Sequence, residues 1–405
     1  MSIKEQMVKH MTEDIIPFWE RIADEKNGGY LGLVDENGIP DPKADKGCIL
    51  NSRILWFFSR ASLALKKEDK PEEKLLADAK RAFLFLRDAF LDREYGGVLW
   101  SVTADGKPSD TTKHTYCQAF AIYGLSAYYE AQGDKEALAM AKDLMETIES
   151  RCRDEAGYLE AFARDFGPCS NEKLSENGVM ASRTMNTLLH VFEAYTELYR
   201  VSTEEKVREK LLFILELFRS EMYNPVLHRQ EVFFDADYRS LIDLHSYGHD
   251  IETAWLLTRG LEVLNDENMT AKMLPIIADL TEQVYRTAFN GYYLYNECER
   301  GVQDRRCIWW VQAEAVIGFT NVAQLFEGRE DYRKAAEAVW GWIQERVIDR
   351  AHGGEWHGLL DIQGNPVPGQ NLADEWKCPY HNGRMCLEMM KRLDLPAGIW
   401  ENKSE

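Results

Sequence analysis

The stretch Tyr95-Gly96-Gly97-Val98 marks a turn between two long helical stretches, residues 71–90 and 116–132. Similar glycine marks recur along the chain, as Gly28-Gly29-Tyr30, Gly157-Tyr158-Leu159, Asn290-Gly291-Tyr292-Tyr293 and His352-Gly353-Gly354-Glu355-Trp356. They are about 61 to 68 residues apart, except for one gap of about 134 residues that holds two units. In that gap, residues 223–234 take the place of the missing mark. Six units of about 65 residues therefore account for almost the whole chain.

Each unit contains amphipathic helical stretches, usually two, in which apolar residues recur every three or four positions. The expected helices are 49–65 with 71–90, 116–132 with 135–151, 183–199 with 203–222, 252–264 with 271–288, 310–326 with 332–347, and a last stretch from residue 381. A helix pair cannot bury its own apolar stripe, so six pairs closed in a ring are the economical arrangement. We therefore predict an all-α (α/α)6 barrel with short strands, hairpins and loops at one end. An open solenoid of six units is the alternative.

Composition limits the class of protein. No linker rich in Pro, Gly or Ser divides the 405 residues, so we expect a single domain over residues 1–405. The formal net charge of −20 argues against nucleic acid or an anionic membrane as a partner. The eight cysteines are scattered, the N-terminus lacks a signal-peptide pattern, and no apolar run is long enough to span a bilayer. We expect a cytoplasmic protein, monomeric or weakly homo-oligomeric.

The stretch His245-Ser246-Tyr247-Gly248-His249-Asp250-Ile251-Glu252-Thr253-Ala254-Trp255 combines two imidazoles, a carboxylate and an indole. If a helix begins near Tyr247, His249 and Glu252 lie on one face, because residues three apart are neighbours there. A carboxylate beside an imidazole can orient the ring and tune its pKa. This face therefore suits proton transfer.

Polar and aromatic residues interrupt the apolar pattern mainly in the first helix of each pair. They are Arg53, Tyr116 after Lys113-His114, Asn186 and His190, His249 and Glu252, Trp310 and Glu314, and the stretch from Trp376 through His381 to Arg384. If all inner helices run in the same direction, these residues meet at the barrel axis. Core packing alone would not repeat them at equivalent positions.

Three chemistries fit such a pocket. Histidines four apart can share a zinc ion, but Gly248 weakens a helix through His245 and His249, and no third ligand is evident. A glycosidase needs two carboxylates, for which Glu252 and Glu314 are candidates, but the histidines would then have no role. Sites dominated by histidine suit removal and return of a proton next to a carbonyl. We favour the third chemistry.

These residues lie in strings that resemble the N-acylglucosamine 2-epimerase family, and within it the cellobiose 2-epimerases. The most specific strings are Ser52-Arg53-Ile54-Leu55-Trp56, His245 to Glu252, Trp309-Trp310-Val311-Gln312-Ala313-Glu314, and Trp376 to Arg384. The resemblance covers the full length of the chain. It implies an (α/α)6 barrel that epimerises C2 of the reducing-end glucose of β-1,4-linked disaccharides such as cellobiose and lactose. It implies no cofactor and no metal.

The resemblance also implies roles for five catalytic residues. His249 and His381 would be the acid and base on opposite faces of C2. His190 would assist proton movement at the enediolate oxygens, and Arg53 would stabilise the enediolate charge. Glu252 would orient His249. This fits the chemistry, because the C2 hydrogen is acidic only when its anion spreads onto O1 near a cation.

Five further residues would bind the sugar. Tyr116, Asn186 and Glu314 resemble hydrogen-bonding partners of the sugar hydroxyls. Trp310 and Trp376 resemble platforms on which apolar sugar faces stack. Two alternatives differ in function: an aldose–ketose isomerase on the same scaffold, which shares the enediolate, and a sugar-binding module without turnover. Binding alone would not require the cluster of histidines.

Overall fold

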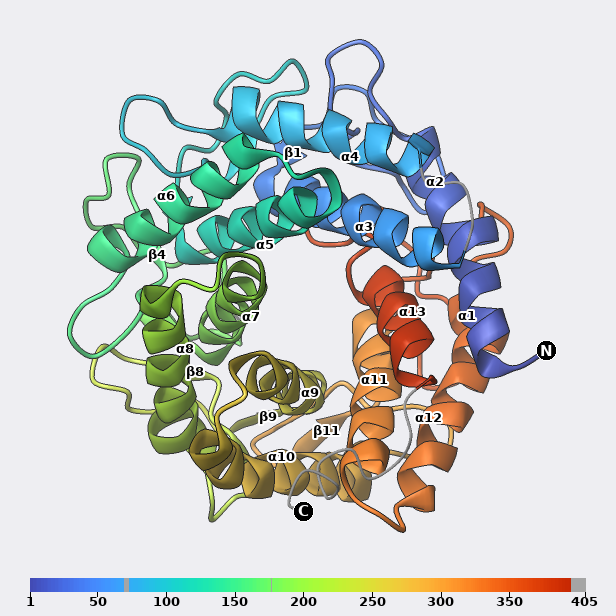
Figure 1. Cartoon of the computed structure of the whole chain (residues 1–405). Helices are drawn as coiled ribbons and strands as arrows, with labels where there is room; N and C mark the ends of the chain where they lie inside the picture. The colour runs from blue at the N-terminus through green and yellow to red at the C-terminus, as the bar shows by residue number, and fades with distance from the viewer. Residues whose placement is uncertain (69–72, 176, 395–405) are drawn as a thin grey trace.

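The helices form a closed double ring, which Figure 1 shows from one end. The computed structural model describes residues 1–68, 73–175 and 177–394. The inner helices are α3 (Cys48–Lys67), α5 (Thr115–Gln132), α7 (Met185–Ser202), α9 (Tyr247–Leu264), α11 (Trp309–Leu325) and α13 (His381–Arg392). The outer layer consists of α4 (Glu73–Phe85), α6 (Lys135–Arg151), α8 (Glu205–Leu217), α10 (Glu267–Ala288), α12 (Glu330–Trp342) and the N-terminal α1 (Ile3–His10) and α2 (Ile16–Arg21). The predicted (α/α)6 barrel is confirmed.

The ring closes where the last unit meets the N-terminus. Helix α13 contacts both α1 and α3. The Val34 N–H donates to the Ala373 carbonyl and the Leu372 N–H donates to the Val34 carbonyl, both at 2.9 Å. The Trp19 indole N–H donates to Glu355 Oε2 at 2.7 Å. These contacts exclude the open solenoid, and they show that the N-terminal helices supply the outer member of the sixth pair.

Connections from inner to outer helices are short. A residue in the left-handed conformation ends the inner helix, as Gly133 (φ 70°), Thr203 (φ 54°) and Asn265 (φ 48°) do after α5, α7 and α9. Asp134 and Asp266 then cap the outer helix by accepting backbone N–H groups of its first turn. Such two-residue links make successive helices antiparallel neighbours. The inner helices consequently all run in the same direction.

Short antiparallel strands join neighbouring units at the end where the inner helices begin. The strand before an inner helix pairs with a strand that follows the next outer helix. The pairs are β1 (Lys46–Gly47) with β2 (Ser101–Val102), β3 (Lys113–His114) with β4 (Ala161–Phe162), β5 (Arg183–Thr184) with β8 (Phe233–Phe234), β9 (Leu244–Ser246) with β10 (Glu297–Glu299), and β12 (Cys307–Ile308) with β13 (Leu359–Leu360). Strand β10 also pairs with the next strand in the chain, β11 (Val302–Asp304). Strands β6 (Tyr223–Asn224) and β7 (Arg229–Gln230) form a hairpin. The predicted short strands are therefore present.

Each glycine mark follows an outer helix and is opened by an Asp or Asn whose side chain accepts backbone N–H groups two or three residues later. These residues are Asp24, Asp92, Asp154, Asn224, Asn290 and Asp349. In the fourth unit His228 adopts the left-handed conformation (φ 54°), so that no glycine is needed there. The buried Lys46 ammonium lies 2.7 Å from Asp24, and Lys113 lies 3.0 Å from Asp92. These ion pairs fix the marks against the starts of α3 and α5.

The inner helices are buried on all sides, because they lie between the outer helices and the barrel axis. Helix α11 is accordingly apolar around most of its circumference. Close approach of inner helices requires small residues: a Cβ at Gly383 of α13 would lie 2.5 Å from the Phe57 ring of α3. Across the described residues no helix has the length and apolar character needed to cross a bilayer. All eight cysteines are unpaired.

Candidate active site

A cavity of about 500 Å³ opens at the end of the ring where the inner helices begin. Its volume is in the range of small-ligand sites. Nine of the ten residues singled out in the sequence line it, namely Arg53, Tyr116, Asn186, His190, His249, Glu252, Trp310, Trp376 and His381. They come from the six inner helices or from the segment just before α13. Residues far apart in the sequence therefore meet at the barrel axis.

A glycine at the start of α9 places the aromatic wall of the cavity. The helix begins at Tyr247, as the sequence predicted. A Cβ at Gly248 would lie 2.5 Å from the Trp310 indole, so that only glycine lets this indole pack against the first turn of α9. The Trp310 ring then lies 4.8 Å from the His249 ring and 5.5 Å from the His381 ring, measured between centroids. The indole contacts both imidazoles.

His249 has a neutral partner. Its Nδ1 lies 2.7 Å from Ser246 Oγ, at the end of strand β9. Burial, together with a smaller effect of the nearby His190, lowers the pKa of His249 to about 3. The imidazole is therefore uncharged near neutral pH. With Nδ1 engaged, Nε2 is the nitrogen that remains for a ligand in the cavity.

His381 has a charged partner. Its Nδ1 lies 2.6 Å from Glu314 Oε1. An ionised carboxylate only accepts hydrogen bonds, so Nδ1 carries the proton and Nε2 is left for a ligand. Burial and the charge of Arg384 hold the pKa of His381 well below its usual value. Glu314 also accepts from the Trp255 indole N–H at 2.8 Å, which fixes the carboxylate in place.

His190 resembles His381 in its surroundings. Its Nδ1 lies 2.9 Å from Glu193 Oε2 on the same helix, α7. The Tyr380 hydroxyl donates to the same carboxylate oxygen. The Tyr116 ring meets the His190 ring edge-on at 5.1 Å. These contacts restrict the imidazole.

Arg53 is a buried cation with no carboxylate among the ion-pair partners of the described residues. It is 2% exposed. Its guanidinium donates to the Tyr116 hydroxyl at 2.9 Å and to the Trp376 carbonyl at 3.1 Å. The guanidinium carbon lies over the rings of Phe120 and Tyr380 at 4.1 and 4.3 Å. Its positive charge is therefore available to a ligand oxygen in the cavity.

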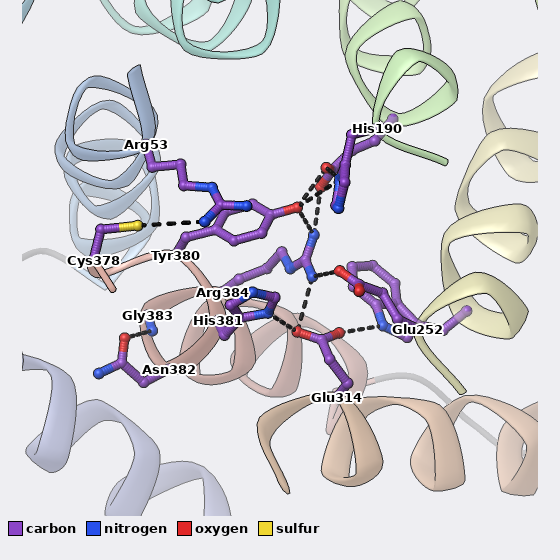
Figure 2. A network of polar contacts seen from close by, with 12 residues as sticks. Arg53, His190, Glu252, Glu314, Cys378, Tyr380, His381, Asn382, Gly383 and Arg384 are labelled. Atoms are coloured by element: carbon purple, nitrogen blue, oxygen red, sulfur yellow. Dashed lines mark hydrogen bonds and ion pairs between the residues drawn. The ribbon is translucent and has the colours of Figure 1, made fainter. Parts of the chain in front are cut away.

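Arg384 connects three buried carboxylates, as Figure 2 shows for those of Glu252 and Glu314. The third is Glu193, which binds the other terminal nitrogen. Burial and the charge of Glu314 raise the pKa of Glu252 to about 7. Burial opposes ionisation of Glu193 as well, but Arg384 and the hydrogen bond from His190 lower the pKa of Glu193 to about 2. Glu193 is therefore an anion at neutral pH.

The hypothesis of a zinc ion at His245 and His249, and a second group of possible metal ligands, can be tested against these contacts. His245 and His249 do not converge on one ligand, because His245 Nε2 lies 2.8 Å from Asp250 Oδ2. Donor atoms of Glu252, Glu314 and His381 lie within 4.8 Å of one another. The Arg384 guanidinium already bridges the two carboxylates of that group. It supplies the positive charge that a metal would bring.

Two expectations differ from the geometry. Glu314 was expected to bind sugar, but it is fully buried, does not line the cavity and lies behind His381. It is one helical turn deeper in the barrel than Trp310, where His381 covers it. Glu252 was expected to orient His249, but its described ion-pair partner is Arg384, and Ser246 binds the imidazole.

Four residues of this site were not predicted to contribute to it: Ser246, Glu193, Tyr380 and Arg384. Ser246 and Glu193 each lie three residues from a histidine, a spacing that brings side chains together on a helix or at its first turn. Tyr380 and Arg384 flank His381 within a string that was already noted. Their contacts join α13 to α7 and α9, and such long-range pairing has no local sequence signal.

Comparison with known proteins identifies similar chains. The family model described as N-acylglucosamine 2-epimerase matches residues 29–382. A cellobiose 2-epimerase from Eubacterium cellulosolvens is 51% identical over 403 residues, which cover 96% of this chain and 98% of that protein.

Solved structures of other proteins have a similar fold. A sugar epimerase from a ruminal bacterium superposes with a TM-score of 0.93 at 44% identity, covering 96% of this chain and 99% of its own. A D-mannose isomerase superposes with a TM-score of 0.81 over 96% of this chain and 99% of its own. At 19% identity, the second likeness shows the shared fold alone.

Proposed function

The chain belongs to the N-acylglucosamine 2-epimerase family, and we propose that it epimerises C2 of the reducing-end glucose of β-1,4-linked disaccharides. Cellobiose would become glucosyl-mannose, and lactose would become epilactose. The cellobiose 2-epimerases at 41–51% identity over nearly the full length support this activity. No cofactor enters the proposed reaction.

One observation carries the proposal: two imidazoles, the half-buried His249 and the buried His381, line one cavity with Nδ1 engaged and Nε2 left for a ligand. Inversion at a carbon needs a base on one face and an acid on the other. The Trp310 indole contacts both rings, which keeps the two imidazoles at a fixed separation across the cavity.

The reaction follows from this placement. After the pyranose ring opens, one imidazole removes the C2 proton through Nε2, and the C–H electron pair forms the C1–C2 double bond while O1 takes the negative charge. The other histidine takes up a proton from solvent before this step and, as imidazolium, returns that proton to C2 from the opposite face. Each histidine regains its starting state by exchange with solvent, so no atom or electron is gained or lost.

The remaining residues have supporting roles in this proposal. Arg53 stabilises the enediolate, because a buried cation without a carboxylate partner interacts strongly with a new negative charge. His190 moves protons at the enediolate oxygens. Tyr116 and Asn186 bind sugar hydroxyls.

The two indoles and two carboxylates complete the assignment. Trp310 and Trp376 stack on sugar rings. Glu314 acts through His381, which it holds by Nδ1. Glu252 balances the charge of Arg384 at the wall of the cavity.

Proton NMR of lactose incubated with the protein in D₂O tests the proposal. We expect epilactose with deuterium at C2. Lactulose would identify an aldose–ketose isomerase, and unchanged lactose would identify a binding protein without turnover. The double variant His249→Ala, His381→Ala is the control, because it retains the cavity walls but has neither imidazole.

We further propose that residues 1–405 act as one domain in the cytoplasm. Helices from both ends of the described chain belong to one ring, which supports a single domain. Eight unpaired cysteines support a reducing compartment.

A further inference from the structure

Glu193 is a buried carboxylate for which the proposed reaction gives no role. It lies on α7, is 3% exposed and does not line the cavity. Its oxygens accept hydrogen bonds from the Tyr380 hydroxyl and from Arg384, and one of them lies 2.9 Å from His190 Nδ1. Burial of a charge is costly unless it is paired, so this arrangement holds the carboxylate ionised in one orientation.

The state of His190 follows from that partner. An ionised carboxylate accepts hydrogen bonds and donates none, so Nδ1 of His190 must carry the proton. In the neutral imidazole the lone pair is then on Nε2. Ring contacts oppose rotation of the imidazole, since Phe120 lies 4.8 Å away and Tyr116 5.1 Å away.

We infer that Glu193 is a positioning residue that fixes the tautomer and the orientation of His190, so that Nε2 of His190 accepts a proton from a sugar hydroxyl. The inference rests on the proposed function, in which His190 moves protons at the enediolate oxygens. Without Glu193, the neutral imidazole can place its proton on Nε2 and becomes a donor where an acceptor is needed. Glu193 acts through His190 and does not touch the substrate.

A matched control lies one turn further along the same helix. Glu197 is 6% exposed and pairs with Arg200 at 2.8 Å and with Arg259 at 3.1 Å. It shares with Glu193 the residue type, the helix and the burial of an ion-paired carboxylate. Its described ion-pair partners include no histidine. Glu197→Gln therefore shows what loss of a buried carboxylate on α7 does to the fold alone.

The experiment compares wild type, Glu193→Gln and Glu197→Gln labelled with ¹⁵N-histidine, at about pH 8.5, where an ordinary histidine is neutral. The His190 signals are assigned from their absence in His190→Asn. We expect a protonated Nδ1 in wild type and in Glu197→Gln, and a mixture of tautomers in Glu193→Gln. We also expect kcat on lactose to fall about ten- to a hundredfold in Glu193→Gln, with KM changed less than about threefold. Glu197→Gln should keep kcat within about twofold of wild type after its Tm is taken into account.

Several results would overturn the inference. A wild-type spectrum with the proton on Nε2 of His190 does so without any variant, even if Glu193→Gln fails to fold. An unchanged tautomer in Glu193→Gln does so even if activity falls, and so does a changed tautomer with wild-type kcat. The spectrum needs no turnover, so absence of epimerisation in wild type would remove the proposed function and leave the test of the tautomer intact.

Discussion

The two histidines proposed to act at C2 lie in different surroundings. On one side, His249 contacts a hydroxyl, Ser246 Oγ, at 2.7 Å. On the other side, His381 contacts a carboxylate, Glu314 Oε1, at 2.6 Å, and Arg384 lies beside that carboxylate. Both imidazoles are buried enough that their pKa values lie below the ordinary range.

The difference concerns the charged form of each ring. When an imidazole takes up a proton, a carboxylate stabilises the resulting imidazolium far more than a hydroxyl does. Arg384 opposes this effect, because its charge lowers the pKa of His381. The two histidines are therefore expected to differ as bases, and only His381 depends on an anionic partner. A pair of unequal bases removes the C2 proton from the two epimers at unequal rates, although the overall equilibrium is that of the sugars.

The largest effect is expected from removal of either imidazole. His249→Ala and His381→Ala should each lower epimerisation by roughly 10² to 10⁴-fold, because neither remaining histidine reaches both faces of C2. Both variants should still fold, which circular dichroism and Tm would verify. Wild-type turnover in either variant would show that the assignment is wrong.

Deuterium uptake in the same two variants sharpens the comparison. Each remaining histidine can still exchange the C2 proton of the epimer whose hydrogen faces it. We expect deuterium to enter C2 of lactose in one variant and C2 of epilactose in the other, as measured by NMR in D₂O. The two exchange rates should differ, because one imidazole contacts a carboxylate and the other a hydroxyl.

A smaller effect is expected from Glu314→Gln, which removes the charge beside His381 and keeps the shape. The activity should fall roughly ten- to a hundredfold, because the imidazolium at His381 loses its stabilising partner. The indole of Trp255 and the guanidinium of Arg384 also contact this carboxylate, so Tm must be measured in parallel. A variant with lower Tm but unchanged kcat would assign Glu314 to the fold alone.

The pH dependence of kcat in wild type and in Glu314→Gln is a second test of the role of Glu314. Burial raises the pKa of Glu314 above its ordinary value. As the pH falls through this raised value, the carboxylate gains a proton and its support of His381 is lost. Wild-type kcat should therefore decline on the acid side, beginning above the ordinary pH range for a glutamate. In Glu314→Gln that decline should be absent, whereas a decline retained in full would contradict this assignment.

A still smaller effect on kcat is expected from Ser246→Ala, which changes the partner of His249. It removes one neutral hydrogen bond from His249, and the Trp310 indole continues to hold the ring. The loss in kcat should be about three- to tenfold. Because the partner of His249 carries no charge, the shape of the pH profile should stay that of wild type. A loss equal to that of Glu314→Gln would show that the two histidines are supported equally.

Much of the fold was accessible from the sequence because the six units repeat a local signal. Glycine is needed where the chain turns back after each outer helix, so its spacing revealed the units. The signal failed in the fourth unit, where His228 adopts the left-handed conformation instead. The Asp or Asn that opens every turn, including Asn224, is a more regular marker of the units than glycine.

The sequence predicted which residues line the cavity, but not which residues lie deeper along the barrel axis. Residues at the starts of the inner helices face the cavity, and those predictions of position agree with the structure. Helical spacing placed Glu314 on the face of Trp310, but spacing carries no information on depth along the barrel axis. The partners of the buried charges were missed for a similar reason, since Arg384 pairs with carboxylates from three other helices.

The smallest effect on epimerisation is expected from a chelator. Treatment with a chelator tests whether a metal causes the difference between the surroundings of His249 and those of His381. Among the described residues, only the His381 side groups donor atoms closely enough for an ion, those of Glu252, Glu314 and His381. Arg384 bridges the two carboxylates, and an added cation would have to displace a guanidinium that is 1% exposed. Epimerisation should therefore be unchanged after treatment with EDTA, and added zinc or manganese should not increase it. If EDTA abolished turnover and a divalent ion restored it, the difference between the surroundings of His249 and His381 would have to be attributed to a metal and not to Glu314.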